Sequence, residues 1–211
     1  MSASSRETIL ARVRQATAGS ASVHVVRARE ASPLDGDSRR ELFLERLREY
    51  GTTVVACPAD ELHASIDQVL REHDVAAVAV APGLEEHAQP TLRAISGATR
   101  EDLASAAAVV TECAIAVAES GTVILNTGPG QGSRLLTLLP PLHVCVVKTR
   151  QIVETLPEAF EVLEEYVKAS AAPLTFISGP SATTDIGLER VVGVHGVQRL
   201  VVVLVDEEQA S

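Results

Sequence analysis

Short, uninterrupted runs of aliphatic residues alternate with amphipathic segments along most of the chain. The run from Val75 to Val80 contains no polar residue, so it lacks the alternation of a strand with one solvent-exposed face. Strands of this kind, separated by helices, favour parallel pairing with helices packed outside the sheet. We therefore expect an α/β fold with a mostly parallel central sheet flanked by helices. Further strands are expected at residues 52–57, 107–111, 122–125, 143–147, 174–177 and 200–205.

The first 37 residues depart from this pattern. The segment from Ser4 to Ala18 predicts one helix with a narrow apolar stripe, and a polar stretch containing Pro33 and Gly36 follows it. We expect an N-terminal helical arm over residues 1–37 and an α/β domain over residues 38–211. The stripe suits packing on a partner subunit in a homo-oligomer and suits equally well packing on the chain's own domain.

Composition narrows the class of protein. The 211 residues include 18 basic and 28 acidic side chains, for a net charge of −10, which argues against a nucleic-acid partner. No apolar run approaches the roughly 20 residues of a membrane helix, and the first residues lack the apolar stretch of a signal peptide. Cys57, Cys113 and Cys145 are far apart without a CxxC pair, so we expect a cytoplasmic protein with no metal and no cofactor.

A glycine-rich loop follows the strand expected at 122–125. Glycine at alternate positions lets successive backbone N–H groups converge on an anion, and Arg134 can grip a carboxylate or phosphate through two hydrogen bonds. The GxGxG spacing matches neither the dinucleotide fingerprint nor the P-loop, and a plain tight turn explains the glycines equally well. The candidate ligand-binding residues of this loop are Gly128, Gly130, Gln131, Gly132 and Arg134.

Glu119 precedes the same strand in a context of small and apolar residues, with Gly121 and Thr122 directly after it. A partly desolvated carboxylate there would have a raised pKa and could act as a general base or nucleophile. The alternative is a structural carboxylate held by loop N–H groups or by Arg134.

Two further loops carry polar residues near strand ends. Hydroxyl and N–H groups after the strand at 174–177 suit a carboxylate or phosphate, although helix capping also explains them. His195 lies between Gly193 and Gly196, where it could perform acid–base chemistry or be held structurally by a hydrogen bond. The ligand-binding candidates after the strand are Ser178, Gly179, Ser181, Thr184 and Asp185.

Together these stretches resemble the lactate-utilisation protein C family of the LUD-domain superfamily. The residues that carry the resemblance are AIAVAESGTVIL (114–125), TGPGQGSRLLTLLPPLHVCVV (127–147), ISGPSATTDI (177–186) and GVHG (193–196). The resemblance implies a fold similar to that of sugar-phosphate isomerases and CoA transferases. It also implies a cytoplasmic system that oxidises L-lactate to pyruvate beside two iron–sulfur partner proteins. Gly187 and Val197 depart from the family pattern, which usually has Glu and Pro there.

Three hypotheses follow. The first is a lactate-utilisation subunit that binds a small anionic metabolite in a cleft at the carboxyl ends of the strands, where open α/β sheets bind ligands. The second is an independent isomerase or CoA-transferase-like enzyme, with Glu119 and His195 as catalytic residues. The third is a non-catalytic assembly or regulatory subunit. The first two expect Glu119, Arg134, Ser181 and His195 to line one cavity.

Overall fold

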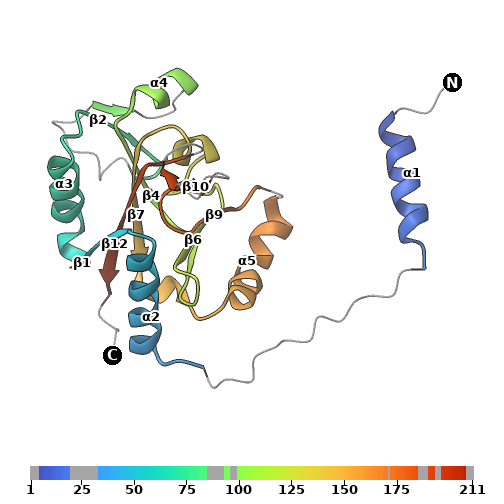
Figure 1. Ribbon diagram of the computed structural model, residues 1–211, viewed down its shortest axis with the longest axis horizontal. Coiled ribbons are helices and arrows are strands. Elements are labelled where there is room, and N and C mark those ends of the chain that lie inside the picture. The colour runs from blue at the N-terminus through green and yellow to red at the C-terminus, as the bar shows by residue number, and fades with distance from the viewer. Residues whose placement is uncertain are drawn as a thin grey trace. The chain divides into compact units, whose positions relative to one another are not determined.

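A computed structural model describes residues 5–19, 33–84, 93–95, 99–170, 172–184, 190–192 and 196–207 (Figure 1). Contacts divide the chain into two units, residues 1–32 and 33–211. The first unit contains helix α1 (Ser5–Thr17), which confirms the helix expected at 4–18 and has no buried residue. The second unit begins with helix α2 (Gly36–Glu49), which starts two residues before the boundary that we expected for the α/β domain.

The central sheet has six strands in the order β1-β12-β7-β4-β2-β3, and all its pairs are parallel. The expected mostly parallel sheet is therefore confirmed. Its middle strands are buried on both faces, which explains their unbroken apolar sequences. The strands are β1 (Thr53–Pro58), β12 (Arg199–Asp206), β7 (Leu142–Lys148), β4 (Ala108–Glu112), β2 (Ala77–Val80) and β3 (Arg93–Ile95).

A second, four-stranded sheet has the order β8-β5-β6-β9. Two strands that we expected in the central sheet, at 122–125 and 174–177, belong to this one instead, because the chain leaves β4 at Cys113 and enters a hairpin of β5 and β6. Its strands are β8 (Ile152–Val153), β5 (Ile115–Val117), β6 (Thr122–Leu125) and β9 (Thr175–Ile177). A separate antiparallel pair consists of β10 (Ala182–Thr184) and β11 (Arg190–Val192).

The helices and sheets of the second unit form four layers. Helices α3 (Leu62–Glu72) and α4 (Arg100–Ser105) cover one face of the central sheet. Helix α2 and the inner face of the second sheet cover its other face, and helix α5 (Leu156–Ser170) covers the outer face of the second sheet (Figure 1). Short 3-10 helices connect these layers at η1 (Ala59–Glu61), η3 (Arg134–Thr137) and η4 (Thr149–Gln151).

The start of α2 is fixed by Asp35. Its carboxylate accepts a hydrogen bond of 2.7 Å from the backbone N–H of Ser38, which lowers the pKa of Asp35. Asp35 is therefore the capping residue of α2. The cap places Arg39 and Arg40 near the beginning of the helix. In the described part of the chain, no helix is both long and apolar enough to cross a membrane.

The turn between β5 and β6 packs closely against α2. Gly121 adopts a φ of 57°, and a Cβ added there would lie 2.8 Å from the Cβ of Arg46 and 3.2 Å from the backbone nitrogen of Leu47. Gly121, a candidate ligand-binding residue, thus allows two backbones to approach each other.

The substitution Gly121→Ala is expected to reduce the free energy of unfolding by about 2–4 kcal/mol, because it adds both a steric overlap and a disfavoured φ. Urea denaturation measures the change. The control is Gly36→Ala, where an added Cβ meets nothing within 4 Å. Equal stability of the two variants would show that the turn is not packed in this way.

His143 on β7 is fully buried. Its Nε2 atom lies 2.8 Å from the hydroxyl of Thr111, its Nδ1 atom has no partner, and burial lowers its pKa to about 4. The folded protein therefore keeps this imidazole neutral at acidic pH, as expected of a structural histidine.

The unfolded chain binds a proton at His143 near its ordinary pKa of 6.5, whereas the folded state does so only near pH 4. Stability contributed by this difference is complete above pH 6.5 and falls by about 2 kcal/mol on acidification to roughly pH 5. Urea denaturation at both pH values measures the loss. The variant His143→Gln should lose less stability over this interval, and an identical pH dependence of both proteins would contradict the assignment.

Candidate functional site

One cavity lies at the carboxyl ends of β1, β7 and β12, where parallel sheets bind ligands. It has a volume of about 1020 Å³. Three arginines line it, and we call it the arginine groove. Its residues are Gly36, Asp37, Arg39 and Arg40 from α2, Ala59 after β1, Thr149, Arg150 and Ile152 after β7, and Asp206 and Glu207 at the end of β12.

Two of the three arginines are paired with carboxylates. Arg40 donates from Nε and Nη2 to the two oxygens of Asp206, both at 3.1 Å. The Nη1 atom of Arg150 lies 3.0 Å from the Oε2 atom of Glu207. Within each pair the two charges neutralise each other at the rim of the groove. Because both pairs are partly exposed to solvent, they contribute little to stability.

Arg39 differs from the other two. Its Nη1 atom donates to the carbonyl of Ile152 at 3.2 Å, and its Nε atom is buried without an acceptor. Within the described part of the chain, no carboxylate lies within ion-pair distance of its guanidinium. A buried donor without an acceptor lowers the stability of the folded protein. Among the three arginines of the groove, Arg39 is the one that forms no described ion pair.

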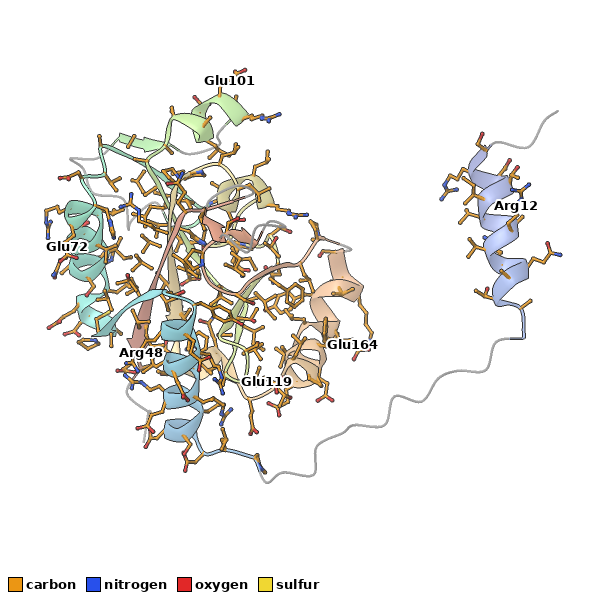
Figure 2. All side chains as sticks on the ribbon, viewed as in Figure 1. Arg12, Arg48, Glu72, Glu101, Glu119 and Glu164 are labelled. Atoms are coloured by element: carbon orange, nitrogen blue, oxygen red, sulfur yellow. The ribbon has the colours of Figure 1, made fainter. Side chains whose placement is uncertain are left out.

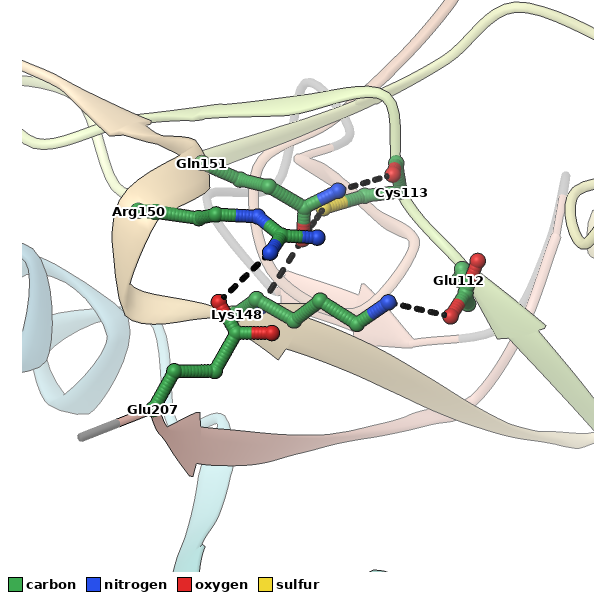
Figure 3. A network of polar contacts seen from close by, with 6 residues as sticks. All are labelled: Glu112, Cys113, Lys148, Arg150, Gln151 and Glu207. Atoms are coloured by element: carbon green, nitrogen blue, oxygen red, sulfur yellow. Dashed lines mark hydrogen bonds and ion pairs between the residues drawn. The ribbon is translucent and has the colours of Figure 1, made fainter. Parts of the chain in front are cut away.

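Gln151 lies between two residues of the groove, Arg150 and Ile152, and its side chain joins a network of polar contacts (Figure 3). Its amide nitrogen donates to the carbonyl of Cys113 at 2.8 Å, and its amide oxygen accepts from the backbone N–H of Lys148 at 2.8 Å. Lys148 in turn lies 3.0 Å from Glu112, with 25% and 26% of the two side chains exposed. This network ties the ends of β4 and β7 to η4 and so fixes the direction in which Arg150 leaves the backbone.

Backbone donors of the glycine-rich loop are already engaged. Gly130 donates to the carbonyl of Pro82, Gln131 and Gly132 both donate to Gly128, and Gly128 donates to the side chain of Asn126. An anion bound by these groups would have to replace intramolecular bonds. Gly130 has a φ of 74°, and a Cβ there would lie 2.8 Å from a carboxylate oxygen of Glu112.

The glycine-rich loop also borders a smaller cavity of about 300 Å³, formed with the end of α5. Gly128 and Gln131 line it together with Thr127 and Tyr166. Thr127 has a φ of 61°, which is rare for a β-branched residue. Arg134 is exposed on η3 and lines neither cavity.

Glu119 lies at the tip of the β5–β6 hairpin, at the surface beside the start of α5 (Figure 2). Its carboxylate accepts a hydrogen bond of 3.0 Å from the backbone N–H of Leu156, the first residue of that helix. The side chain is exposed, contrary to the desolvation that we expected, because the hairpin tip projects beyond the sheet. The contact matches the alternative of a carboxylate held by a loop N–H group.

The serine- and threonine-rich loop meets the hairpin at one point. The hydroxyl of Thr122 lies 2.8 Å from the hydroxyl of Ser178. The next residue, Gly179, packs against the side chain of Tyr50. Because β6 and β9 are antiparallel, Ser178, which follows β9, lies beside the start of β6. The glycine-rich loop leaves the opposite end of β6.

The remaining candidates lie near the start of β12 or outside the described residues. The backbone N–H of Ser181 donates to the carbonyl of Val197. Ser181 and Thr137 of η3 both lie close to Gly196. Thr184 is in β10, whereas Asp185 and His195 are not among the described residues. The common cavity expected for Glu119, Arg134, Ser181 and His195 stays a prediction.

Sequence reasoning missed the arginine groove. Arg39 and Arg40 are interleaved with glutamates, which is typical of a solvated helix face. The available signal was positional: a pair of arginines just after a helix cap, and Arg150 directly after a central strand. Only the parallel order of β1, β12 and β7 brings these positions together.

The buried cysteines have no described reactive environment. Burial and a hydrogen bond with Cys145, the larger cause, raise the pKa of the Cys113 thiol well above its ordinary value. A thiol of this kind is a poor nucleophile at neutral pH. All three cysteines are free and buried.

Known proteins match most of the chain. The sequence model of the LUD domain family matches residues 40–205. A lactate utilization protein C from Deinococcus radiodurans is 41% identical over 174 residues, which cover 80% of this chain and 81% of that protein. A second lactate utilization protein C, from Anoxybacillus flavithermus, is 30% identical over a region that covers 80% of this chain and 82% of that protein. The crystal structure of a DUF162 family protein from Deinococcus radiodurans has a TM-score of 0.70 at 33% identity, covering 82% of this chain and 99% of that one.

The substitution Gln151→Ala is expected to lower the free energy of unfolding by about 2–3 kcal/mol, because it leaves the Cys113 carbonyl and the Lys148 N–H without partners. Chemical denaturation measures this loss. Gln68→Ala is the matched control: it removes an exposed hydrogen bond of 2.8 Å to Glu72 and should change stability by less than about 0.5 kcal/mol. A loss of similar size in both variants would mean that the network is not structural.

Proposed function

This chain belongs to the LUD domain family, and we propose that it serves in the utilisation of L-lactate by binding a small anionic metabolite in the arginine groove. The relatives named lactate utilization protein C support the metabolic role. The guanidinium of Arg39, which lines the groove and forms no described ion pair, is the observation that carries the binding role.

A carboxylate supplies what Arg39 lacks. It brings a negative charge and two oxygens that accept N–H groups, and charge-assisted hydrogen bonds of this kind are roughly twice as strong as neutral ones. Arg40 and Arg150 already have acidic partners, so they add donors at the rim without a comparable demand for a ligand. L-lactate and pyruvate are both monocarboxylates, and recognition of this shared group suits a protein that acts at either side of the oxidation.

The cytoplasmic setting and the iron–sulfur partner proteins that the family resemblance implies form part of the same proposal. An independent enzyme that uses Glu119 receives less support. The contact with the start of α5 and the exposure of the side chain favour a structural role for that carboxylate.

Isothermal titration of the full chain with pyruvate, L-lactate and acetate tests the binding role. We expect binding of at least one of these carboxylates and a loss of affinity of about tenfold or more in Arg39→Gln, since one charge-assisted interaction disappears. Arg48→Gln is the matched control, because Arg48 is exposed on the same helix and lies outside the groove (Figure 2).

Deletion of the gene should impair growth on L-lactate, and the wild-type gene, unlike the Arg39→Gln gene, should restore it. Undiminished affinity in Arg39→Gln would remove the groove from the proposal. Normal growth of the deletion strain on L-lactate would remove the metabolic role.

A further inference from the structure

Helix α1 presents an apolar stripe that is exposed among the described residues. Ile9 and Val13, four residues apart on one helix face, are 61% and 53% exposed. Arginines flank the stripe at positions 6, 12 and 14, and Figure 2 shows Arg12 on the helix surface. Three arginines against one glutamate give α1 a net charge of +2. An exposed helix of 13 residues is marginally stable alone, so it gains from docking.

The second unit carries an apolar surface of its own, which we call the aromatic patch. It consists of Phe160 and Val167 on α5 and Phe176 on β9, with 51%, 48% and 43% of each residue exposed. The two rings lie 5.9 Å apart. Among the described strands, β9 is an edge of the second sheet, so the patch borders an unpaired strand.

The few aromatic side chains of this chain lie mostly at its surface. The chain has three phenylalanines and two tyrosines, and of the three phenylalanines only Phe43 is buried in the core. Aromatic residues are enriched in the centres of protein interfaces, where they contribute much of the binding energy. Two neighbouring exposed phenylalanines in so aromatic-poor a chain therefore indicate a docking surface.

The acidic residues around the aromatic patch favour a positively charged partner. Helix α5 carries four glutamates and one lysine, for a net charge of −3, and Glu164 lies on its outer face (Figure 2). Two aromatic patches placed face to face would bring these like charges together. A helix with an apolar stripe between arginines, such as α1, is complementary both in polarity and in charge.

We propose that α1 of one copy of this chain docks on the aromatic patch of a second copy. Ile9 and Val13 contact Phe160 and Phe176, and arginines of α1 face glutamates of α5. Reciprocal exchange of the two helices gives a closed twofold dimer. The 18 residues between α1 and α2 can span up to about 60 Å when extended, enough to reach a neighbouring subunit.

Sedimentation velocity of the full chain over the micromolar range tests this. We expect a dimer whose dissociation constant rises about tenfold or more in the double variant Ile9→Asp/Val13→Asp. The control Ala11→Asp/Gln15→Asp adds the same charge at the same spacing on the opposite face of α1 and should leave the dimer intact. Phe160→Ser should weaken the dimer, and Glu164→Lys should do so without removing any packed side chain.

Mixing gives the sharpest outcome. The α1 double variant retains a functional patch and Phe160→Ser retains a functional α1, so their mixture should form heterodimers through one remaining contact. A wild-type chain that is monomeric throughout would overturn the proposal. So would a dimer that is unaffected by the α1 double variant, or one that the control pair disrupts equally.

Discussion

Burial of both faces of the central sheet is the constraint on which the rest of the structure depends. Helices α3 and α4 cover one face, and α2 with the second sheet covers the other, so the residues between the ends of β12 and all of β7 before Lys148 are buried. The charged residues of β4, β7 and β12 therefore lie at the strand ends. Because all strands of this sheet are parallel, their carboxyl ends lie at one edge, and charged residues gather there.

Within that edge, pairing distinguishes the arginines. Asp206 and Glu207 neutralise Arg40 and Arg150, while Arg39 is held by a single carbonyl and retains a buried donor. Arg39 is thus the one of these three arginines without a described ion pair. Its buried donor lowers the stability of the folded protein. A bound carboxylate, in our proposal, supplies the charge that Arg39 lacks.

The sequence predicts the central sheet well because runs such as Leu200 to Val205 have only one plausible environment. It does not distinguish the second sheet, since a short apolar strand such as Thr122–Leu125 has the same pattern in either sheet. Glycines at 121 and 130 were identified as special, but the close approach that each allows is to Arg46 and Glu112 of the protein itself. The environment of Arg39 could not be predicted from the sequence, because its hydrogen-bond acceptor, the carbonyl of Ile152, is 113 residues away.

The side-chain resonance of the Arg39 Nε–H group in an arginine-selective ¹⁵N spectrum measures the central claim directly. Titration with a carboxylate that binds the protein should shift this resonance and slow its exchange with water, while the resonance of Arg48 stays unchanged. An unperturbed Arg39 signal at saturating ligand, with shifts at other arginines instead, would contradict the account and place the anion elsewhere.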